Sequence, residues 1–323
     1  MIKHKNNNVR NILLFAFAIA YAEKVYVLSF AYLCVFLRSL IGEHVSLCIV
    51  KKELDQLIQD GILFTRKGTY SLDITPSVFD DSVRLRKIAI QKIYHSRHAL
   101  QALSYAPFIR AMAITGSVAF GSATEKSDID LFFLVHPRRI WTARMGVLFL
   151  SACMGRRRDR TRGGKDKLCS NYFLTSQTDM PVKNIASAHL FRCALPLFNK
   201  NLFFTFLKNN ARMEGFLPTP LLVVPHIDKR IGVYHSIKKV IEKVLSGTLG
   251  DYVEHISQKW QCSRLQKKIK REGGDTSHFF ISDEIIALHY PVSQNKIVMT
   301  RYQDKIKEIS PFFTSFSLIF LLF

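Results

Sequence analysis

The sequence lacks the cysteine patterns that mark zinc sites and disulfide frameworks. Its six cysteines are scattered over 323 residues, with no Cys-x-x-Cys pair and no Cys/His cluster at zinc-ligand spacing. Isolated cysteines of this kind usually pack as small apolar side chains. We therefore expect reduced cysteines, most of them in the core of a cytoplasmic protein.

An uncharged apolar run long enough to cross a membrane is also missing. Ile12–Ala22 and Val25–Ile41 are apolar, but Glu23-Lys24 separates them and Arg38 interrupts the second run. The apolar tail Pro311–Phe323 is short, whereas a membrane-spanning helix needs roughly 20 apolar residues. No small-residue cleavage site follows the first run, which argues against a signal peptide. We interpret these runs as buried helices, and membrane contact through the apolar termini is the alternative that we do not favour.

Acidic residues are scarce relative to basic ones. Asp and Glu number 25 against 46 Lys and Arg, which gives a formal net charge of +21. Such an excess favours an anionic partner, such as a nucleic acid, a nucleotide or an acidic membrane surface, and says nothing about the fold. With 48% hydrophobic residues, the chain can bury a sizeable core and form two or three domains.

Two short apolar runs carry the most informative pattern in the chain. Phe108–Thr115 ends abruptly at Gly116-Ser117, and Ile129–Val135 is preceded by Asp128 and interrupted by Asp130. Short apolar runs bounded by turn residues predict buried strands. Since side chains alternate along a strand, Asp128 and Asp130 are expected to point to the same side.

The two aspartates carry like charges, which repel unless a cation lies between them. Carboxylate oxygens, with room for water and phosphate, suit Mg²⁺, or Mn²⁺ in its place. A glycine lets backbone approach a ligand, and N–H groups beside a serine hydroxyl can hold phosphate oxygens. The pattern therefore predicts one site for a metal and a nucleoside triphosphate. The simpler alternative is that the aspartates cap a strand at a solvated edge. The predicted nucleotide-binding residues are Gly116, Ser117, Ser127 and Lys167.

The combination of Gly116-Ser117, a short spacer and Asp128-Ile129-Asp130 resembles the signature of the DNA polymerase β-like nucleotidyltransferase superfamily. The resemblance implies an α+β core, in which helices accompany a small mixed sheet. It also implies metal-dependent transfer of a nucleoside monophosphate from an NTP to an acceptor, with release of pyrophosphate. Asp128 and Asp130 would be the catalytic, metal-binding residues.

The superfamily usually has a third carboxylate on a later strand, and here the sequence departs from the pattern. The next predicted strand, Lys167–Leu174, has Asn171 where an acid would be expected, and Asp166 lies just before it. A neutral amide is a poorer metal ligand and no base. Either Asp166 supplies the third metal ligand, or transfer is slow, or the site binds nucleotide without transferring it.

Residues 1–77 are predicted to form a winged-helix-like module. Two apolar helices and a third over Val50–Gly61 precede a hairpin over Ile62–Leu72. Basic residues of the third helix and of the hairpin turn would contact a nucleic-acid backbone. These residues are Lys51, Lys52, Arg66 and Lys67. The alternative is a structural or protein-binding module, because a few basic residues are also an ordinary solvated face.

Residues 78–180 are predicted to form the nucleotidyltransferase core. An amphipathic helix over Val78–Leu103, with Lys92 on its polar face, leads into the first strand, and an apolar helix over Ile140–Met154 follows the second. After that helix comes the densest basic run of the chain. Its first arginines are Arg156, Arg157 and Arg158. Such a run is usually a solvated loop, but its position also suits a grip on triphosphate or RNA.

Residues 181–323 are predicted to be a helical C-terminal region. Helices are expected over Ile185–Leu207, Ile231–Leu245 and Asp251–Arg271. In the first of these, His189 is interpreted as a structural histidine rather than a ligand.

Several stretches of the chain also resemble an uncharacterised prokaryotic group. They are Asp166–Leu174, Phe279–Tyr290 and Tyr302–Ile309. In that group, a winged-helix-like N-terminus precedes the nucleotidyltransferase core and a helical C-terminus follows it. The resemblance therefore implies the three-part order given above, and it implies no substrate.

Three functions remain open on the sequence. The leading hypothesis is a metal-dependent nucleotidyltransferase that uses an NTP and acts on an acceptor such as tRNA, with RNA favoured over DNA. The second is a nucleotide-sensing, nucleic-acid-binding regulatory protein without transfer activity, which Asn171 supports. The third is a membrane-associated protein anchored by its apolar ends.

Overall fold

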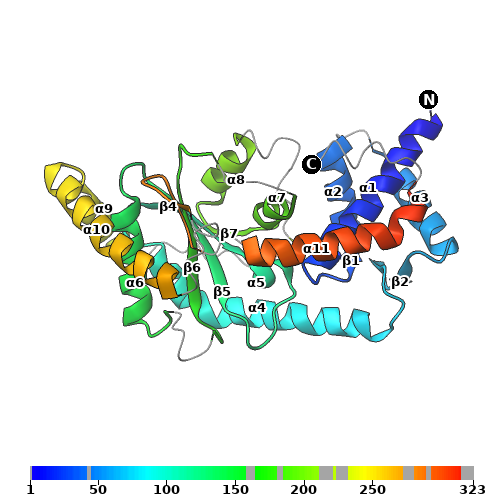
Figure 1. The fold of residues 1–323 in the computed structure, drawn as a ribbon, viewed down its shortest axis with the longest axis horizontal. Helices are drawn as coiled ribbons and strands as arrows, with labels where there is room; N and C mark the ends of the chain where they lie inside the picture. The colour runs from blue at the N-terminus through cyan, green and yellow to red at the C-terminus, as the bar shows by residue number, and fades with distance from the viewer. Residues whose placement is uncertain are drawn as a thin grey trace.

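The computed structural model describes residues 2–41, 45–157, 164–179, 185–210, 221–222, 232–271, 280–288 and 292–313. Within these ranges the chain is an α+β protein (Figure 1). A mixed sheet with helices on both faces lies beside a helix-rich unit, and the long helix α4 (Ser77–Leu103) runs from one to the other.

The helix-rich unit, hereafter the N-terminal unit, begins with six elements. They are α1 (Ile2–Ala22), β1 (Leu28–Ser29), α2 (Phe30–Ile41), α3 (Leu47–Gln59), β2 (Phe64–Arg66) and β3 (Thr69–Ser71). The strands form an antiparallel sheet in the order β1-β3-β2. The predicted third helix and hairpin are confirmed. Strand β1 was not predicted, because two residues are too few to show a periodic pattern.

The two ends of the described chain pack together in the N-terminal unit. Helix α11 (Val292–Ile309) lies along α1, and a short 3₁₀ turn, η2 (Ser310–Phe312), follows it (Figure 1). Tyr302 of α11 is 2% exposed and meets Phe15 of α1 edge to face, with ring centroids 6.0 Å apart. Most of the described apolar side chains of α1 and α2 are buried in this core, as predicted, whereas Val35 of α2 is 43% exposed. Among the described residues, no helix combines the length and apolar character that a membrane crossing requires.

The second part of the chain builds the large sheet and its helices. Its elements before the sheet's last strands are β4 (Ile109–Thr115), α5 (Gly116–Phe120), β5 (Ile129–Val135), α6 (Ile140–Cys153), β6 (Leu168–Thr175), α7 (Ile185–Arg192), β7 (Leu195–Phe198), α8 (Lys200–Lys208), α9 (Gly232–Val244) and α10 (Thr248–Arg271). Strands β8 (Phe280–Ile281) and β9 (Ile285–Ala287) follow. The strand order is β7-β4-β5-β6-β9-β8, in which β5 and β6 are parallel and the other neighbours antiparallel.

Both faces of the large sheet are covered. Leu131 and Phe133 of β5 pack with α4, α6 and α10 on one face, whereas Phe132 and Leu134 pack with α7 and α8 on the other. A strand buried on both faces reads as a continuous apolar run, which explains the pattern of Ile129–Val135. The predicted strands and helices between residues 77 and 175 are confirmed to within two residues at each end.

The prediction that residues 181–323 are helical is wrong at three places. Strands β7, β8 and β9 from this region join the large sheet. Strand β7 interrupts the helix expected over Ile185–Leu207, because a four-residue apolar run cannot be told from a buried helix by periodicity. Its Pro196 is tolerated because β7 is an edge strand. The helices α9 and α10 are confirmed.

His189 is buried where the N-terminal unit meets the sheet. Its Nε2 lies 3.2 Å from the Tyr32 hydroxyl of α2, and its ring stacks on Phe120 with centroids 5.4 Å apart. Burial lowers the pKa of His189 to about 3, with a further contribution from Arg192. The histidine is therefore neutral in the folded protein and links two helices, which agrees with the predicted structural role.

Candidate functional site

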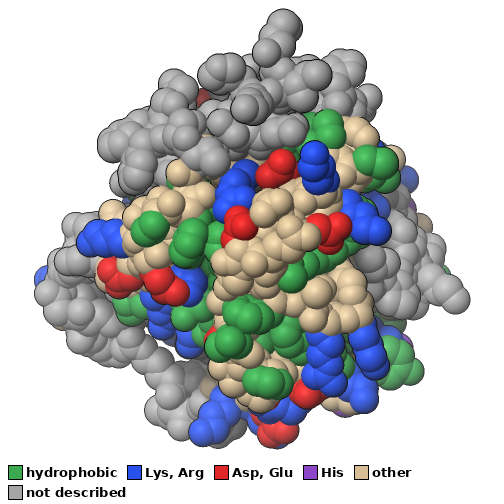
Figure 2. All heavy atoms as spheres, turned by 90° about the vertical axis from the view of Figure 1, so that its right-hand side faces the viewer, with side chains coloured by type: hydrophobic (Ala, Val, Ile, Leu, Met, Phe, Trp, Pro, Cys, Tyr) green, Lys and Arg blue, Asp and Glu red, His purple; other side chains and the backbone are tan. Residues whose placement is uncertain are grey.

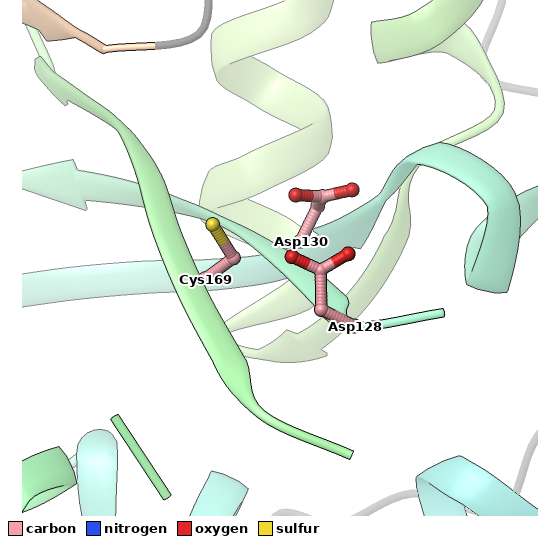
Figure 3. Close-up of side chains that lie close together, drawn as sticks. All are labelled: Asp128, Asp130 and Cys169. Carbon is pink, nitrogen blue, oxygen red and sulfur yellow. The ribbon is translucent and has the colours of Figure 1, made fainter. Parts of the chain in front are cut away.

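Three adjacent strands bring the predicted carboxylates to one end of the sheet. The antiparallel β4–β5 pair places Thr115 opposite Asp130, and the parallel β5–β6 pair places Cys169 beside Asp130. Ligand atoms of Asp128, Asp130 and Cys169 lie within 4.8 Å of one another (Figure 3). The prediction that the two aspartates lie side by side is therefore confirmed.

The bend after β4 touches one of these carboxylates. Gly116 has φ of +66°, a conformation that L-residues with side chains rarely adopt. A Cβ atom at this position would lie 2.8 Å from Asp130 Oδ2. Glycine is thus required twice, for the backbone turn and for the space that Asp130 occupies.

Asn171 holds Asp130 in place from the neighbouring strand. The β5–β6 register shifts between Ser170 and Tyr172, so that Asn171 is an extra residue on β6. Its Nδ2 donates to Asp130 Oδ1 at 2.6 Å, while its Oδ1 accepts from Cys169 Sγ at 2.9 Å. The thiol proton is used in this chain of hydrogen bonds. The donor set offered to a cation is therefore two carboxylates, which suits a hard ion such as Mg²⁺.

Lys92 fastens the two loops that precede β5 and β6. It is 4% exposed, and its Nζ donates to Glu125 O at 2.8 Å, to Ser127 O at 2.9 Å and to Asp166 Oδ1 at 2.7 Å. Two sequence predictions are wrong here. Lys92 lies on the inner face of α4 rather than on its polar face. The Asp166 carboxylate is engaged by Lys92 and lies outside the aspartate group, so it does not supply the third ligand.

A pocket of about 450 Å³ opens in front of the two aspartates. One side, hereafter the sheet wall, comes from the strand ends and the bend. It includes Thr115, Gly116, Ser117, Asp128, Asp130 and Asn171. The other side, hereafter the helix wall, comes from the end of α1 and from α11. It includes Ala22, Glu23, Lys24, Ile297, Val298 and Arg301. The N-terminal unit therefore completes a pocket that the sheet alone leaves open.

The helix wall contributes a carboxyl group and a guanidinium to the pocket. Burial raises the pKa of Glu23 to about 7, and the nearby Arg301 opposes that rise. The Glu23 backbone is held to the sheet side by Ser122, whose hydroxyl donates to Glu23 O at 3.4 Å. The pocket thus contains a third carboxyl group, that of Glu23, which changes its charge near neutral pH.

The other predicted nucleotide-binding residues divide between the pocket and its surroundings. Ser117 and Ser127 line the pocket. Lys167 does not, because the turn at residues 164–167 directs it toward the end of α6, where Nζ donates to Gly155 O at 2.8 Å. In this position Lys167 does not line the pocket, and its predicted role in nucleotide binding stays a prediction.

The basic run after α6 is described only at its start. Arg156 donates to Asp166 O at 3.2 Å, so it secures the loop rather than facing the pocket. Arg157 forms an isolated bridge with Leu168 and is exposed. Arg158 lies outside the described residues, and its predicted contact with nucleic acid stays a prediction.

The predicted nucleic-acid contacts of the N-terminal unit are all on its surface. Lys51 and Lys52 are exposed on α3, and Lys67 is exposed at the hairpin turn. Arg66 forms an ion pair with Asp80 at 2.8 Å. Figure 2 shows Lys and Arg side chains interspersed with acidic and hydrophobic ones on this face, so the basic residues do not gather into one patch there.

Sequence reasoning missed the residues that reach the site from a distance. The Glu23-Lys24 pair did interrupt two apolar runs, and a charged pair at a helix end next to apolar sequence is a signal that could have been followed. Arg301 gives no comparable signal, because only the packing of α11 along α1 brings it to the pocket. Lys92 was hidden in a helix rich in basic residues.

A comparison of the chain with family models, with curated proteins and with solved structures finds no match. The site is therefore described by its own geometry. Its defining features are two adjacent carboxylates, a glycine bend in contact with one of them, and a pocket closed by a second part of the chain.

Proposed function

We propose that the chain is a metal-dependent nucleotidyltransferase that works in the pocket between the sheet wall and the helix wall. The observation that carries the proposal is the contact between the Gly116 bend and Asp130, within a group that also contains Asp128. Asp128 and Asp130 would hold Mg²⁺ or Mn²⁺. A cation bound there would neutralise the charge of the triphosphate and of the leaving pyrophosphate.

The residues around the aspartates support this chemistry by fixing positions. Gly116 and Ser117 line the pocket next to Asp130, where a backbone amide and a hydroxyl can hold phosphate oxygens. Asn171 fixes the orientation of Asp130, and Lys92 fixes the loop that carries Asp128. Catalysis of phosphoryl transfer depends mostly on such positioning and on charge neutralisation.

The proposed reaction needs a base as well as a metal. The acceptor hydroxyl oxygen forms a bond to the α-phosphorus, the bond from that phosphorus to the β-phosphate oxygen breaks, and pyrophosphate leaves. The hydroxyl proton must pass to a base, and Asn171 cannot serve. Glu23 is the remaining carboxyl among the described lining residues, and a pKa of about 7 suits a base at neutral pH. We assign the proton to Glu23.

RNA is the acceptor class that we propose. The net charge of +21 favours an anionic macromolecule over a neutral small molecule. The N-terminal unit also has the element order of a winged helix, with the strand order β1-β3-β2. Because α1 of this unit ends in the helix wall, the unit that we propose to bind RNA also lines the pocket.

The test is transfer of label from each α-labelled NTP to total RNA in the presence of Mg²⁺ or Mn²⁺. Asp128→Ala and Asp130→Ala are expected to abolish transfer. Asp166→Asn is the matched control, because it changes a nearby aspartate that faces Lys92 and keeps an acceptor for it. Unchanged transfer in both alanine variants would rule out this site. An equal loss in the Asp166 control would mean that displacement of the loops, and not the loss of a metal ligand, is responsible.

A second candidate function is nucleotide sensing without transfer. Asn171 favours it, because the amide occupies a lone pair of Asp130 and offers no third carboxylate. This function predicts tight, Mg²⁺-dependent NTP binding by calorimetry with no pyrophosphate released in the presence of RNA. Release of pyrophosphate that depends on Asp130 would exclude it.

A further inference from the structure

Helices α9 and α10 bury polar side chains and expose apolar ones. They are joined by residues 245–247 and lie at the end of the molecule away from the N-terminal unit (Figure 1). A helix on a protein surface normally buries its apolar stripe and exposes its polar face. These two helices bury polar side chains such as Lys238 and Gln261 and expose most of their described apolar ones, while Leu265 of α10 is buried in the core.

The inward side of α9 is attached by charged groups. Lys238 is 6% exposed, and its Nζ donates to Ser104 O at 2.9 Å and to Ile109 O at 2.7 Å. Glu242 accepts from Phe108 N at 2.6 Å and from Arg110 Nη1 at 2.9 Å. The outward apolar residues recur at helical spacing and are 40 to 67% exposed. They are Val233, Tyr234, Ile237, Val240, Ile241 and Val244.

The inward side of α10 is attached in the same manner. Glu254 accepts from Trp141 N at 2.8 Å and from Thr142 N at 2.9 Å, and Gln261 donates to Trp141 O at 2.8 Å. The outward apolar residues of α10 are 47 to 65% exposed. They are Leu249, Tyr252, Ile256 and Trp260. Exposed apolar surface of this extent marks an interaction site.

The charges around the apolar stripes are of one sign. Of the acids on the two helices, Glu242 and Glu254 face inward and Asp251 pairs with Arg139 at 2.7 Å. The exposed charged residues that remain are basic. They are Lys239, Lys243, Lys259, Arg264, Lys267 and Lys270. A second copy would bring like charges together, which is unfavourable, whereas an anionic surface complements them.

We infer that α9 and α10 dock on an anionic lipid surface. Aliphatic and aromatic side chains enter the boundary between headgroups and acyl chains, while the flanking lysines and arginines contact lipid phosphates. Aliphatic residues predominate in the stripes, which suits acyl chains better than nucleic-acid bases. The two helices thus attach to the sheet largely through polar contacts and leave their apolar stripes for the lipid.

The two tryptophans of the chain permit a direct test. Trp141 is 1% exposed and donates through Nε1 to Asp283 at 2.9 Å, whereas Trp260 is 47% exposed. Vesicles of phosphatidylcholine with phosphatidylglycerol are expected to shift the emission of the full chain to the blue, and vesicles of phosphatidylcholine alone are not. Trp260→Phe keeps the apolar surface and is expected to remove the shift while vesicle cosedimentation persists.

Two sets of variants separate the apolar and the basic contributions. Val240→Ser with Ile256→Ser is expected to abolish cosedimentation, and each of Lys239→Gln, Lys243→Gln and Lys259→Gln to lower the vesicle partition coefficient about fivefold. Val83→Ser and Lys87→Gln change exposed residues of α4 and are the matched controls with no expected effect.

Two results would overturn the inference. One is an unchanged emission spectrum with phosphatidylglycerol vesicles. The other is a dimer in sedimentation velocity that Val240→Ser with Ile256→Ser dissolves, which would assign this surface to a second copy of the chain. The Asp130→Ala variant is expected to bind vesicles as the unmodified chain does, so failure here is distinct from failure of the proposed reaction.

Discussion

The sheet wall and the helix wall of the pocket are built in different ways. The sheet wall comes from residues 115–171, whose strands are hydrogen-bonded neighbours, so Asp130 is fixed by ladder register, by Asn171 and by the Gly116 bend. The helix wall comes from residues 22–24 and 297–301, which meet because α11 packs along α1.

The two walls are therefore held in position by different kinds of interaction. The sheet wall depends on short polar contacts, so the displacement of a single atom there also moves the carboxylate groups. The helix wall depends on apolar burial between two helices, in which Tyr302 of α11 packs against Phe15 of α1. Variants in the sheet wall should therefore alter the rate of the transfer reaction. Variants in the helix wall should alter how the protein responds to pH.

The largest effect is expected from Gly116→Ala in the sheet wall. The new Cβ would lie 2.8 Å from Asp130 Oδ2 and would hold φ at +66°, so Asp130 must move. A displacement of that order is expected to reduce NTP transfer about 100-fold. The measurement is the rate of label transfer at saturating NTP.

Gly121→Ala is the matched control for this variant. Gly121 has a similar φ of +72°, but a Cβ there would approach Leu222 rather than a carboxylate. The control carries the same backbone strain and should retain most of the transfer activity. Equal losses in the two variants would mean that strain, and not contact with Asp130, is responsible.

Lys92→Met is expected to cost about 3 kcal/mol of unfolding free energy, because it leaves a carboxylate and two carbonyl groups without their buried donor. Urea denaturation measures the loss. Lys87→Met, at an exposed position of the same helix, should change stability by less than about 0.5 kcal/mol. A Lys92 variant as stable as the Lys87 variant would show that the loops hold without the lysine.

Asn171→Asp should make the stability of the protein depend more strongly on bound metal. The variant loses the 2.6 Å hydrogen bond to Asp130 and gains a third carboxylate, so it is expected to lose about 2 kcal/mol without metal. Mg²⁺ should restore that loss and bind more tightly than to the unmodified chain. Melting temperatures with and without Mg²⁺ provide the measurement. An equal Mg²⁺ response in both proteins would argue against a metal at Asp130.

The same difference between the walls explains how far the sequence could be interpreted. Strand alternation alone placed Asp128 beside Asp130, and a Gly-Ser turn after an apolar run placed the bend, because both depend on near neighbours. The identity of the covering residues depends on tertiary packing. The sequence around Arg301 does not indicate that this residue lines the pocket. The sequence around Asp166 does not indicate that its carboxylate pairs with Lys92.

The three short strands of the C-terminal region were not predicted, for a related reason. Strands β7, β8 and β9 are two to four residues long. Their positions are set by pairing rather than by their own periodicity, because β7 pairs with β4, β9 with β6 and β8 with β9. The α9 and α10 helices were found from their periodicity, but the pattern alone could not say which side faces the sheet. Their charged inner side became evident only from its contacts with the ends of β4 and α6.

The smallest effect on stability is expected from Glu23→Gln in the helix wall, and it should depend on pH. Folding raises the pKa of Glu23 from 4.5 to about 7, so the folded protein holds a proton there that the unfolded chain loses. Stability from this group is complete below pH 4.5 and is lost as pH rises toward 7.

Glutamine mimics the protonated form at every pH. The variant should therefore match the unmodified chain at acidic pH and be more stable by about 1 to 2 kcal/mol above neutrality, less than the full shift implies because the side chain is partly exposed. Urea denaturation of both proteins on either side of this range measures the difference, with Glu125→Gln, an exposed glutamate, as the control. A difference that does not change with pH would mean that folding leaves the pKa of Glu23 unshifted. A variant less stable than the unmodified chain above neutrality would mean that Glu23 is ionised in the fold and that its charge is held by Arg301.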